Sequence, residues 1–309
     1  MFKHLLIITI FLHLTLSEKA YEKVGLKVKI NNSNAVSLNR YFQTVMPGGT
    51  ISFEIIASNS EEIIVTGNSG EIIQVDKVKW KFIAPQKSGN YEIVISNKLS
   101  NQSIVITIFV LTPLSKMNGE YLNDYRIGKY PKEKFKGKKN YQKPKGLIEV
   151  TEENGNIYIS PHFRLKQFLC KQSSGWPKYL LVNPKLILKL EYLVNGLIEL
   201  GINVNTLFIM SGYRTPYYNK SIGNVQYSRH VFGDAADVYV DVNMDGVIDD
   251  LNGDGKKNMD DALVIYSIIN NLEDNPENSS LIGGMGKYKK TSAHTYFIHV
   301  DTRGYKARW

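Results

Sequence analysis

Short stretches of alternating apolar and polar residues dominate the first third of the chain. They lie at residues 24–30, 51–55 and 91–95, and a longer, nearly continuous apolar run follows at 103–110. Alternation with a period of two is the pattern of a half-buried β-strand. Segments rich in Gly, Pro, Ser and Asn separate these stretches. Several short strands at this spacing predict a small β-sandwich.

The end of this region resembles an immunoglobulin-like module. The resemblance rests on Trp80, on Ala84-Pro85 and on the pair Gly89 and Tyr91. The disulfide of antibody domains is absent, so the resemblance concerns the architecture alone. We therefore predict an all-β immunoglobulin-like sandwich over residues 21–112, with a wall-binding or spacer role as a hypothesis.

The pattern changes at residues 113–150, where lysines and prolines replace the alternation. The densest part is Lys129 to Lys139, which holds six lysines in eleven residues. Such a run can bind nucleic acid or an anionic polymer, but more often it is a solvated connection. We therefore predict a basic linker over residues 113–150.

From residue 151 to the end, the pattern is that of a mixed domain with helices and buried strands. Residues 184–201 place Leu186, Leu190, Leu193, Val194, Leu197 and Ile198 on one helical face, with a proline at the start. This spacing predicts an amphipathic helix. Apolar runs at 207–210 and 296–300 predict buried strands. The predicted fold class of residues 151–309 is α+β.

Composition and charge narrow the possible settings of the protein. The chain has 309 residues, of which 43% are hydrophobic and 22% charged, and its formal net charge is +9. These values exclude a mainly disordered, collagen-like or coiled-coil protein. The positive charge favours anionic surroundings such as nucleic acid, acidic lipid or an anionic cell wall. The single cysteine, Cys170, excludes an internal disulfide and a cysteine-rich zinc site.

The N-terminus predicts the compartment. A short basic start is followed by an apolar run from Leu5 to Leu16. This run is shorter than the roughly 20 residues that span a membrane, and its proportions are those of a secretory signal peptide. We predict a signal peptide at residues 1–20, a secreted or periplasmic protein and no stable membrane span, with an uncleaved anchor as the alternative. Secretion also argues against a nucleic-acid partner.

Two segments carry candidate metal chemistry. The first runs from Ser228 to Asp237 and the second from His294 to Asp301. Ser-x-His-x-x-Gly-x-Ala-x-Asp followed by His-x-Asp resembles the zinc D-Ala-D-Ala carboxypeptidases and murein endopeptidases, the LAS-type peptidases. Ser211-Gly212-Tyr213-Arg214-Thr215 and Gly283-Gly284-Met285-Gly286-Lys287-Tyr288 resemble further segments of that family. The resemblance covers about residues 160–309.

The resemblance implies a role for several residues. His230, Asp237 and His299 would be the zinc ligands, a set that leaves the fourth position of the ion open. Arg214 would bind a peptide carboxylate or stabilise the oxyanion, because its guanidinium is a planar fork of donors. Tyr213 and Ser228 would contact substrate, with capping of a turn as the alternative for Ser228.

The general base is assigned by comparing branches of that family. The dipeptidase branch has a glutamate three residues before the last zinc histidine, and here that residue is Tyr296. The carboxypeptidase and endopeptidase branches have a histidine five residues before it, which corresponds to His294. Residues five apart on a strand point to opposite faces, so His294 must approach from a turn before the strand. A structural, solvent-facing histidine is the alternative. Asp301 would orient a ligand from behind.

An acidic insertion at residues 241–261 predicts calcium binding. Two consecutive segments match the front of an EF-hand loop, and they resemble dockerin-type calcium loops. Their candidate ligands are Asp241, Asn243 and Asp245, then Asp250, Asn252, Asp254, Lys256 through its carbonyl, Asn258 and Asp261. Two complete twelve-residue loops would overlap, so we predict one good structural Ca²⁺ site, with a second partial site left open and a metal-free acidic loop as the alternative. A helix over 262–272 is expected to follow.

These observations predict a secreted zinc metallopeptidase that hydrolyses amide bonds of peptidoglycan stem peptides by a zinc-activated water. The anionic cell wall is the expected partner. Carboxypeptidase and endopeptidase action stay open, and no oligomeric state is predicted. The alternative is a non-catalytic zinc- and calcium-binding module on the same fold that acts in cell-wall or protein recognition.

Overall fold

The computed structural model describes residues 25–31, 33–57 and 63–309. The predicted signal peptide, residues 1–20, lies outside the described residues. Within the described part, no helix is long and apolar enough to cross a membrane.

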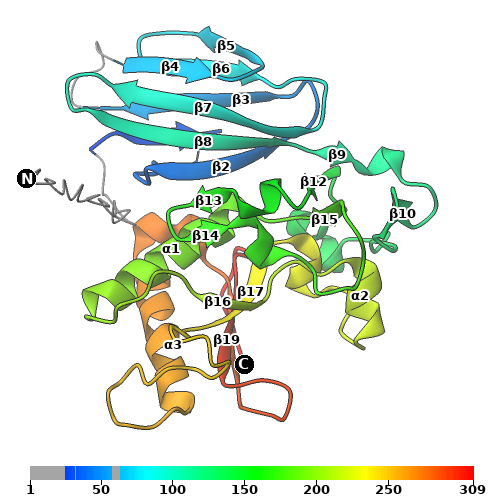
Figure 1. Cartoon of the computed structure of the whole chain (residues 1–309), viewed down its shortest axis with the longest axis vertical. Helices are drawn as coiled ribbons and strands as arrows, with labels where there is room; N and C mark the ends of the chain where they lie inside the picture. The colour runs from blue at the N-terminus through cyan, green and yellow to red at the C-terminus, as the bar shows by residue number, and fades with distance from the viewer. Residues whose placement is uncertain (1–24, 32, 58–62) are drawn as a thin grey trace, which may run out of the picture.

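Two four-stranded sheets form the N-terminal part of the molecule, at the top of Figure 1. The first sheet has the order β1-β3-β6-β5 and is antiparallel; its strands are β1 (Lys27–Ile30), β3 (Thr50–Ile56), β6 (Lys79–Ile83) and β5 (Glu71–Gln74). The second has the order β2-β8-β7-β4, with β2 and β8 parallel; its strands are β2 (Arg40–Val45), β8 (Gln102–Val110), β7 (Gly89–Asn97) and β4 (Ile63–Gly67).

The two sheets share one hydrophobic core, as the alternating pattern predicts. Ile51, Phe53 and Ile55 alternate inward on β3, and Ile104, Ile106 and Ile108 do so on β8. The rings of Phe53 and Trp80 stack within this core with their centroids 6.1 Å apart. The result is a β-sandwich, whereas its immunoglobulin-like identity stays a prediction.

The structure differs from the predicted linker at residues 113–150. This segment folds onto the second part of the molecule with the short strands β9 (Thr112–Pro113), β10 (Tyr121–Leu122), β11 (Tyr125–Arg126) and β12 (Gly146–Val150) and three 3₁₀ turns. Its side chains Leu122, Tyr125, Ile127, Tyr130, Tyr141 and Leu147 are buried in the core of that part. The reason is that aromatic and aliphatic residues lie between the lysines, so the segment has an apolar face that the charge pattern concealed.

A five-stranded sheet organises the second part of the molecule. Its order is β16-β17-β19-β18-β20, antiparallel except for the parallel pair β18 and β20. The strands are β16 (Phe208–Ser211), β17 (Ala235–Tyr239), β18 (Gly284–Tyr288), β19 (Phe297–Asp301) and β20 (Ala307–Arg308). Smaller pieces complete this part, namely β13 (Tyr158–Ser160), β14 (Phe163–Arg164) and β15 (Lys178–Leu180). Mixed α and β structure agrees with the predicted class.

Three helices accompany this sheet: α1 (Pro184–Glu199), α2 (Pro216–Ser221) and α3 (Met259–Asp274). Helix α1 begins where the sequence predicts, because Asn183 caps it by accepting a hydrogen bond from the backbone of Lys185 and Pro184 occupies its first position. Most of the predicted apolar face is buried, but Ile198 is 44% exposed and does not belong to the buried stripe.

The two parts of the molecule are packed together through β2, β8 and α1. Phe42 of β2 and Phe109 of β8 are buried in the core of the second part, and Leu188 of α1 is buried in the core of the sandwich. Strand β13 and helix α1 lie next to β2 in Figure 1. The sandwich is therefore in direct contact with the unit that carries the candidate site.

Candidate metal centre

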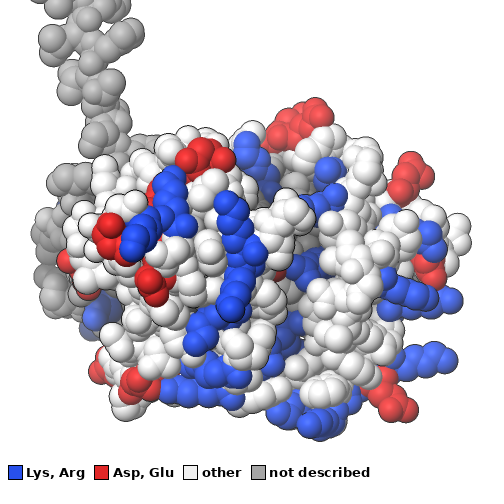
Figure 2. Space-filling view, turned by 90° about the horizontal axis from the view of Figure 1, so that it is seen from below, with Lys and Arg blue, Asp and Glu red and all other residues white. Residues whose placement is uncertain are grey.

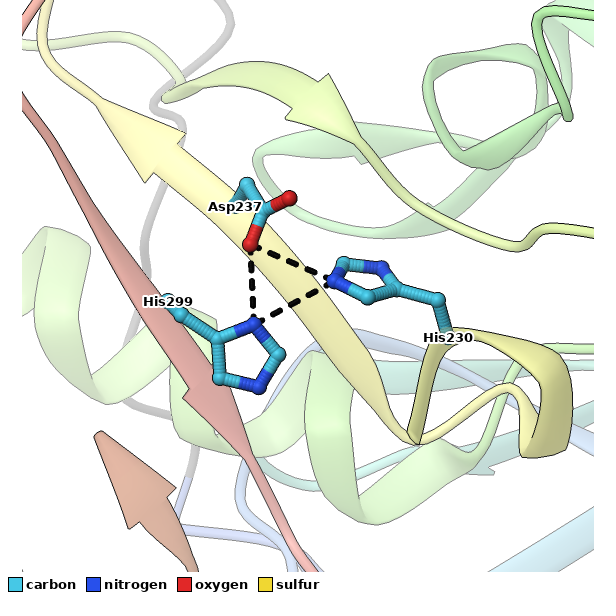
Figure 3. A group of neighbouring side chains, drawn as sticks. All are labelled: His230, Asp237 and His299. Carbon is cyan, nitrogen blue, oxygen red and sulfur yellow. Dashed lines mark hydrogen bonds and ion pairs between the residues drawn. The ribbon is translucent and has the colours of Figure 1, made fainter. Parts of the chain in front are cut away.

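Asp237 and His299 face each other across two neighbouring strands. They are paired in the register of β17 and β19, and His230 approaches from the 3₁₀ turn η6 (Arg229–Phe232) that precedes β17. Figure 3 shows the three side chains converging from these elements on one point. Within the described chain, they form the one group of His, Cys, Asp or Glu side chains spaced to hold a metal ion.

The three facing atoms are close enough to bind one ion. Nε2 of His230 lies 3.2 Å from Nδ1 of His299 and 3.2 Å from Oδ1 of Asp237, and Nδ1 of His299 lies 2.8 Å from the same oxygen. Tetrahedral zinc with ligands at about 2.0–2.2 Å holds them roughly 3.3–3.5 Å apart. The donor set of two imidazoles and one carboxylate is also one that zinc prefers. The residues present therefore fit a zinc ion.

The second nitrogen of each histidine is held from behind. Nδ1 of His230 donates to the carbonyl of Gly212 at 2.7 Å, and Nε2 of His299 lies 3.2 Å from Oδ2 of Asp301. A carbonyl and a carboxylate accept hydrogen bonds, so they place the ring hydrogen on the far nitrogen and direct the near nitrogen to the ion. The orienting contact predicted for Asp301 is present in the structure.

The electrostatics of this group favour a positive charge at its centre. Burial alone would raise the pKa of Asp237, but His230 and His299 hold it far below its usual range. Burial alone would lower the pKa of His299, but the hydrogen bonds that its ring nitrogens make to the carboxylates of Asp237 and Asp301 raise it to about 9. Two carboxylates thus flank one imidazole in a buried place, where an unpaired negative charge is costly.

A tight turn brings His230 to the strand that carries Asp237. Gly233 ends η6 with a φ of 72°, a left-handed conformation that glycine adopts without strain. A Cβ at this position would lie 2.6 Å from the carbonyl oxygen of Leu181. Glycine is therefore required both by the backbone angle and by the close approach of a neighbouring chain segment.

Arg214 is bonded to one of the candidate zinc ligands. Its Nη2 donates to Oδ2 of Asp237 at 2.7 Å, and its Nε donates to Oγ of Ser211 at 2.8 Å. Asp237 thus has one oxygen toward the histidines and the other toward the guanidinium. Sequence reasoning assigned Arg214 to substrate only, whereas the structure gives it a contact that orients a metal ligand.

The candidate ligands line a cavity of about 840 Å³ together with Arg214, Ser228 and His294. His294 lies in the loop before β19, where its carbonyl accepts a hydrogen bond from the backbone of Thr291. This is the approach from a turn that the sequence requires. Its Nδ1 donates to the carbonyl of Thr295 at 2.8 Å, and its ring packs edge-on against Phe297. Ser228 precedes η6, and its side chain makes no capping hydrogen bond there.

Tyr213 does not lie in this cavity, contrary to the predicted substrate contact. Its side chain is 2% exposed, and its hydroxyl is 2.7 Å from that of Tyr130 in the core. Burial raises the pKa of Tyr213 well above its ordinary value. The physical reason is that neighbouring residues of an extended segment point in opposite directions, so Arg214 faces the cavity and Tyr213 the core.

The acidic insertion at 241–261 forms two turns closed by side-chain hydrogen bonds. Asp241 accepts from the backbone of Asp245 and Gly246, and Asp250 accepts in the same way from Asp254 and Gly255. Asp261 is buried and accepts from the backbone of Leu251 and Asn258, which caps α3. Calcium binding here stays a prediction.

Several aromatic residues to which the sequence motifs assigned no role also line the cavity: Phe135, Tyr141, Tyr227, Tyr288, Tyr305 and Trp309. The indole of Trp309 covers Gly286, where a Cβ would lie 2.3 Å from Nε1, and its ring centroid is 5.3 Å from that of His299. The signal available in the sequence was the repetition of aromatic residues among the lysines of 129–141 and in the last five residues.

Comparison with known proteins gives one match. Residues 161–250 match the family model described as Peptidase M15. The match includes His230 and Asp237 and ends before His294, His299 and Asp301, which the fold brings to the same place. It supports a zinc metallopeptidase of the M15 type. No curated protein and no solved structure matches the chain.

Proposed function

We propose that this protein is a secreted zinc peptidase that hydrolyses amide bonds in peptidoglycan stem peptides, of the D-Ala-D-Ala carboxypeptidase or murein endopeptidase type. The observation that carries the proposal is the convergence of His230, Asp237 and His299 in a cavity that also holds a guanidinium and an imidazole. The match to the Peptidase M15 model supports the class of reaction.

The ion would be held by Nε2 of His230, Nδ1 of His299 and Oδ1 of Asp237. When bound, zinc supplies a Lewis acid that polarises the amide carbonyl and increases the acidity of water. The chain keeps its ligands in place through Gly212 and Asp301, so little reorganisation is needed when substrate enters.

His294 is suited to move the proton. Because its Nδ1 donates to a backbone carbonyl, the neutral ring carries its hydrogen there and leaves Nε2 as an acceptor. An acceptor nitrogen in the same cavity as the metal ligands can take a proton from water and return it to the leaving amine. This role accounts for a histidine in the loop before β19.

Arg214 is suited to bind the oxygen on which negative charge develops. Its Nε and Nη2 are engaged by Ser211 and Asp237, and no hydrogen bond from Nη1 is found in the described part of the chain. A fixed guanidinium whose Nη1 is not engaged is a preorganised partner for an oxyanion. Ser228 would add a hydroxyl donor to the substrate backbone on the same side of the cavity.

The proposal includes export of the protein to an anionic cell wall. The apolar N-terminal run and the net charge of +9 support a protein that is exported and works on an anionic wall. The same fold acting only in recognition would need neither an acceptor imidazole nor a fixed guanidinium beside the ion. Their presence in one cavity favours the enzyme.

Mass analysis of digested peptidoglycan and of isolated stem peptides tests the type of peptidase. Loss of a terminal alanine from the free peptides would assign a carboxypeptidase. Conversion of cross-linked dimers to monomers would assign an endopeptidase. A folded, zinc-loaded protein that releases neither product would instead support the recognition module.

We also propose that the loop 250–261 binds one structural Ca²⁺ ion. Support comes from the spacing of Asp250, Asn252 and Asp254 and from Gly255 at the sharp turn, where φ is 78°. A rise in melting temperature with added Ca²⁺ that disappears in Asp250→Ala is expected. No rise with wild-type protein would contradict the site. In the first loop, Lys257 is paired with Asp245 at 3.0 Å and supplies positive charge itself.

A further inference from the structure

The segment of residues 132–141, here called the strap, forms one wall of the cavity that holds the candidate metal centre. Two of its aromatic side chains, Phe135 and Tyr141, line that cavity. The strap lies about ninety residues before His230 in sequence, outside the range matched by the family model. Its position is therefore a property of this chain that the match does not supply.

The strap is fixed to the metal-binding unit by specific contacts. Tyr227 donates from its hydroxyl to the carbonyl of Glu133 at 3.1 Å, and Arg229 donates from Nη1 to the carbonyl of Asn140 at 3.0 Å. Asn140 in turn donates to the carbonyl of Arg303 at 2.6 Å. The ring of Phe135 lies 5.2 Å from the rings of Tyr141 and Tyr227. These contacts hold the strap in place as one wall of the cavity and give its side chains defined positions.

The lysines of the strap are cations without carboxylate partners. Lys132, Lys134, Lys136, Lys138 and Lys139 form no ion pair with any residue of the described chain. Lys138 places Nζ 3.3 Å from the ring centroid of Tyr305, and Lys136 places Nζ 5.3 Å from that of Phe135. Both of these rings line the cavity. Two uncompensated ammonium groups thus lie over rings that line the cavity.

The arginines in the cavity differ from these lysines. Arg214 is paired with Asp237, Arg229 with Asp234, and Arg303 with Asp301, and all three aspartates are buried. Their charges are therefore balanced within the protein. The face of the molecule seen from below carries many more Lys and Arg than Asp and Glu side chains (Figure 2). The strap lysines contribute uncompensated charge beside the aromatic rings that line the cavity.

We propose that the strap selects the substrate by binding the carboxylates of an anionic peptidoglycan strand next to the metal centre. This inference rests on the proposed function and specifies its substrate class as a polymer with several carboxylates. Exposed lysines act on such a polymer as point charges at distances up to a Debye length, and that attraction weakens with salt. Aromatic rings beneath them keep the ammonium groups directed at the cavity edge.

Binding of the full chain to purified peptidoglycan sacculi tests the proposal without relying on turnover. Sacculi whose carboxylates have been converted to amides serve as the matched ligand. The test variant carries Lys136→Gln, Lys138→Gln and Lys139→Gln, and the same three positions changed to Arg form the conservative variant. A charge-matched control carries Lys77→Gln, Lys81→Gln and Lys98→Gln, three exposed lysines of the sandwich.

Wild-type protein is expected to bind native sacculi roughly tenfold more tightly than amidated sacculi at low salt, and the difference should shrink at high salt. The strap Gln variant should lose that preference, whereas the Arg variant and the sandwich control should keep it. Equal binding of native and amidated sacculi by wild type, or a strap Gln variant that keeps the preference, would overturn the proposal. Product analysis of the same sacculi is an independent readout. Hydrolysis without a carboxylate preference in binding would contradict the role of the strap but not the proposed activity. Binding with that preference but without hydrolysis would contradict the proposed activity but not the role of the strap.

Discussion

Asp237 and His299 are directly opposite each other on β17 and β19, with Oδ1 of Asp237 2.8 Å from Nδ1 of His299. Two residues further along β19, Asp301 lies on the same face and contacts the other nitrogen of His299. One imidazole is thus held between two carboxylates, and the pairing of two strands fixes all three groups. The metal centre is a consequence of this register.

The first prediction concerns Asp301, which orients His299. Asp301→Asn keeps the shape of the side chain but removes its charge. We expect zinc affinity to fall roughly 10- to 100-fold, which is typical for loss of a group that orients a metal ligand. Competition with a chromophoric chelator measures the affinity. Asp274→Asn makes the same chemical change at an exposed ion pair with Lys306 and should leave zinc affinity unchanged. Equal affinities of the two variants would contradict the orienting role.

The second prediction concerns Arg214, which contacts both Asp237 and the cavity. Arg214→Lys keeps the charge but cannot reproduce the two hydrogen bonds to Ser211 and Asp237. We expect kcat/KM on a stem peptide to fall roughly 10²- to 10³-fold at saturating zinc. The control is Arg126→Lys, at a more exposed pair with Glu120. Wild-type kinetics in Arg214→Lys would show that the charge alone suffices and that the fork geometry is irrelevant.

The third prediction concerns His294 as the proton carrier. His294→Gln retains a polar side chain of similar reach but cannot exchange a proton. We expect kcat to fall roughly 10²- to 10⁴-fold while the bound zinc per chain is unchanged. A raised KM with an unchanged kcat would assign His294 to substrate contact instead.

The fourth prediction concerns the turn that delivers His230. Gly233→Ala combines an unfavourable φ of 72° with a Cβ that meets the carbonyl of Leu181. We expect a loss of about 1–3 kcal/mol in the free energy of unfolding, measured with urea. Gly223→Ala is the matched control, because its φ is 69° but its Cβ would meet nothing within 4 Å. If both variants lose the same stability, the close approach at Gly233 contributes nothing.

Much of the candidate site could be predicted from the sequence because its residues lie in short, local patterns. His230 and Asp237 are seven residues apart, across one turn and one strand. His299 and Asp301 are two residues apart on a single strand and therefore share a face. Helix α1 could be predicted equally well, because its capping residue and its apolar stripe both lie within one short stretch of sequence. Such features depend on few long-range contacts.

Other features depend on register and burial that one sequence does not display. The bond between Arg214 and Asp237 arises because Ser211 pairs with Asp237 across β16 and β17. The burial of Tyr213 follows from the side of the backbone on which it falls. The predicted linker proved to be packed core at Tyr125 and Tyr141, since its lysines masked an apolar face. Each case required knowing which surface a segment covers.

Zinc-dependent cleavage of cross-linked stem peptides tests most directly whether His230, Asp237 and His299 form a hydrolytic zinc site. Full-length protein would be stripped with a chelator and reloaded with Zn²⁺, with His230→Ala treated in parallel and folding checked for both. We expect amide hydrolysis that is lost on stripping, restored by Zn²⁺ and absent from the folded His230→Ala variant. Hydrolysis that persists in His230→Ala, or a folded, zinc-loaded wild-type protein that cleaves no stem peptide, would contradict this expectation.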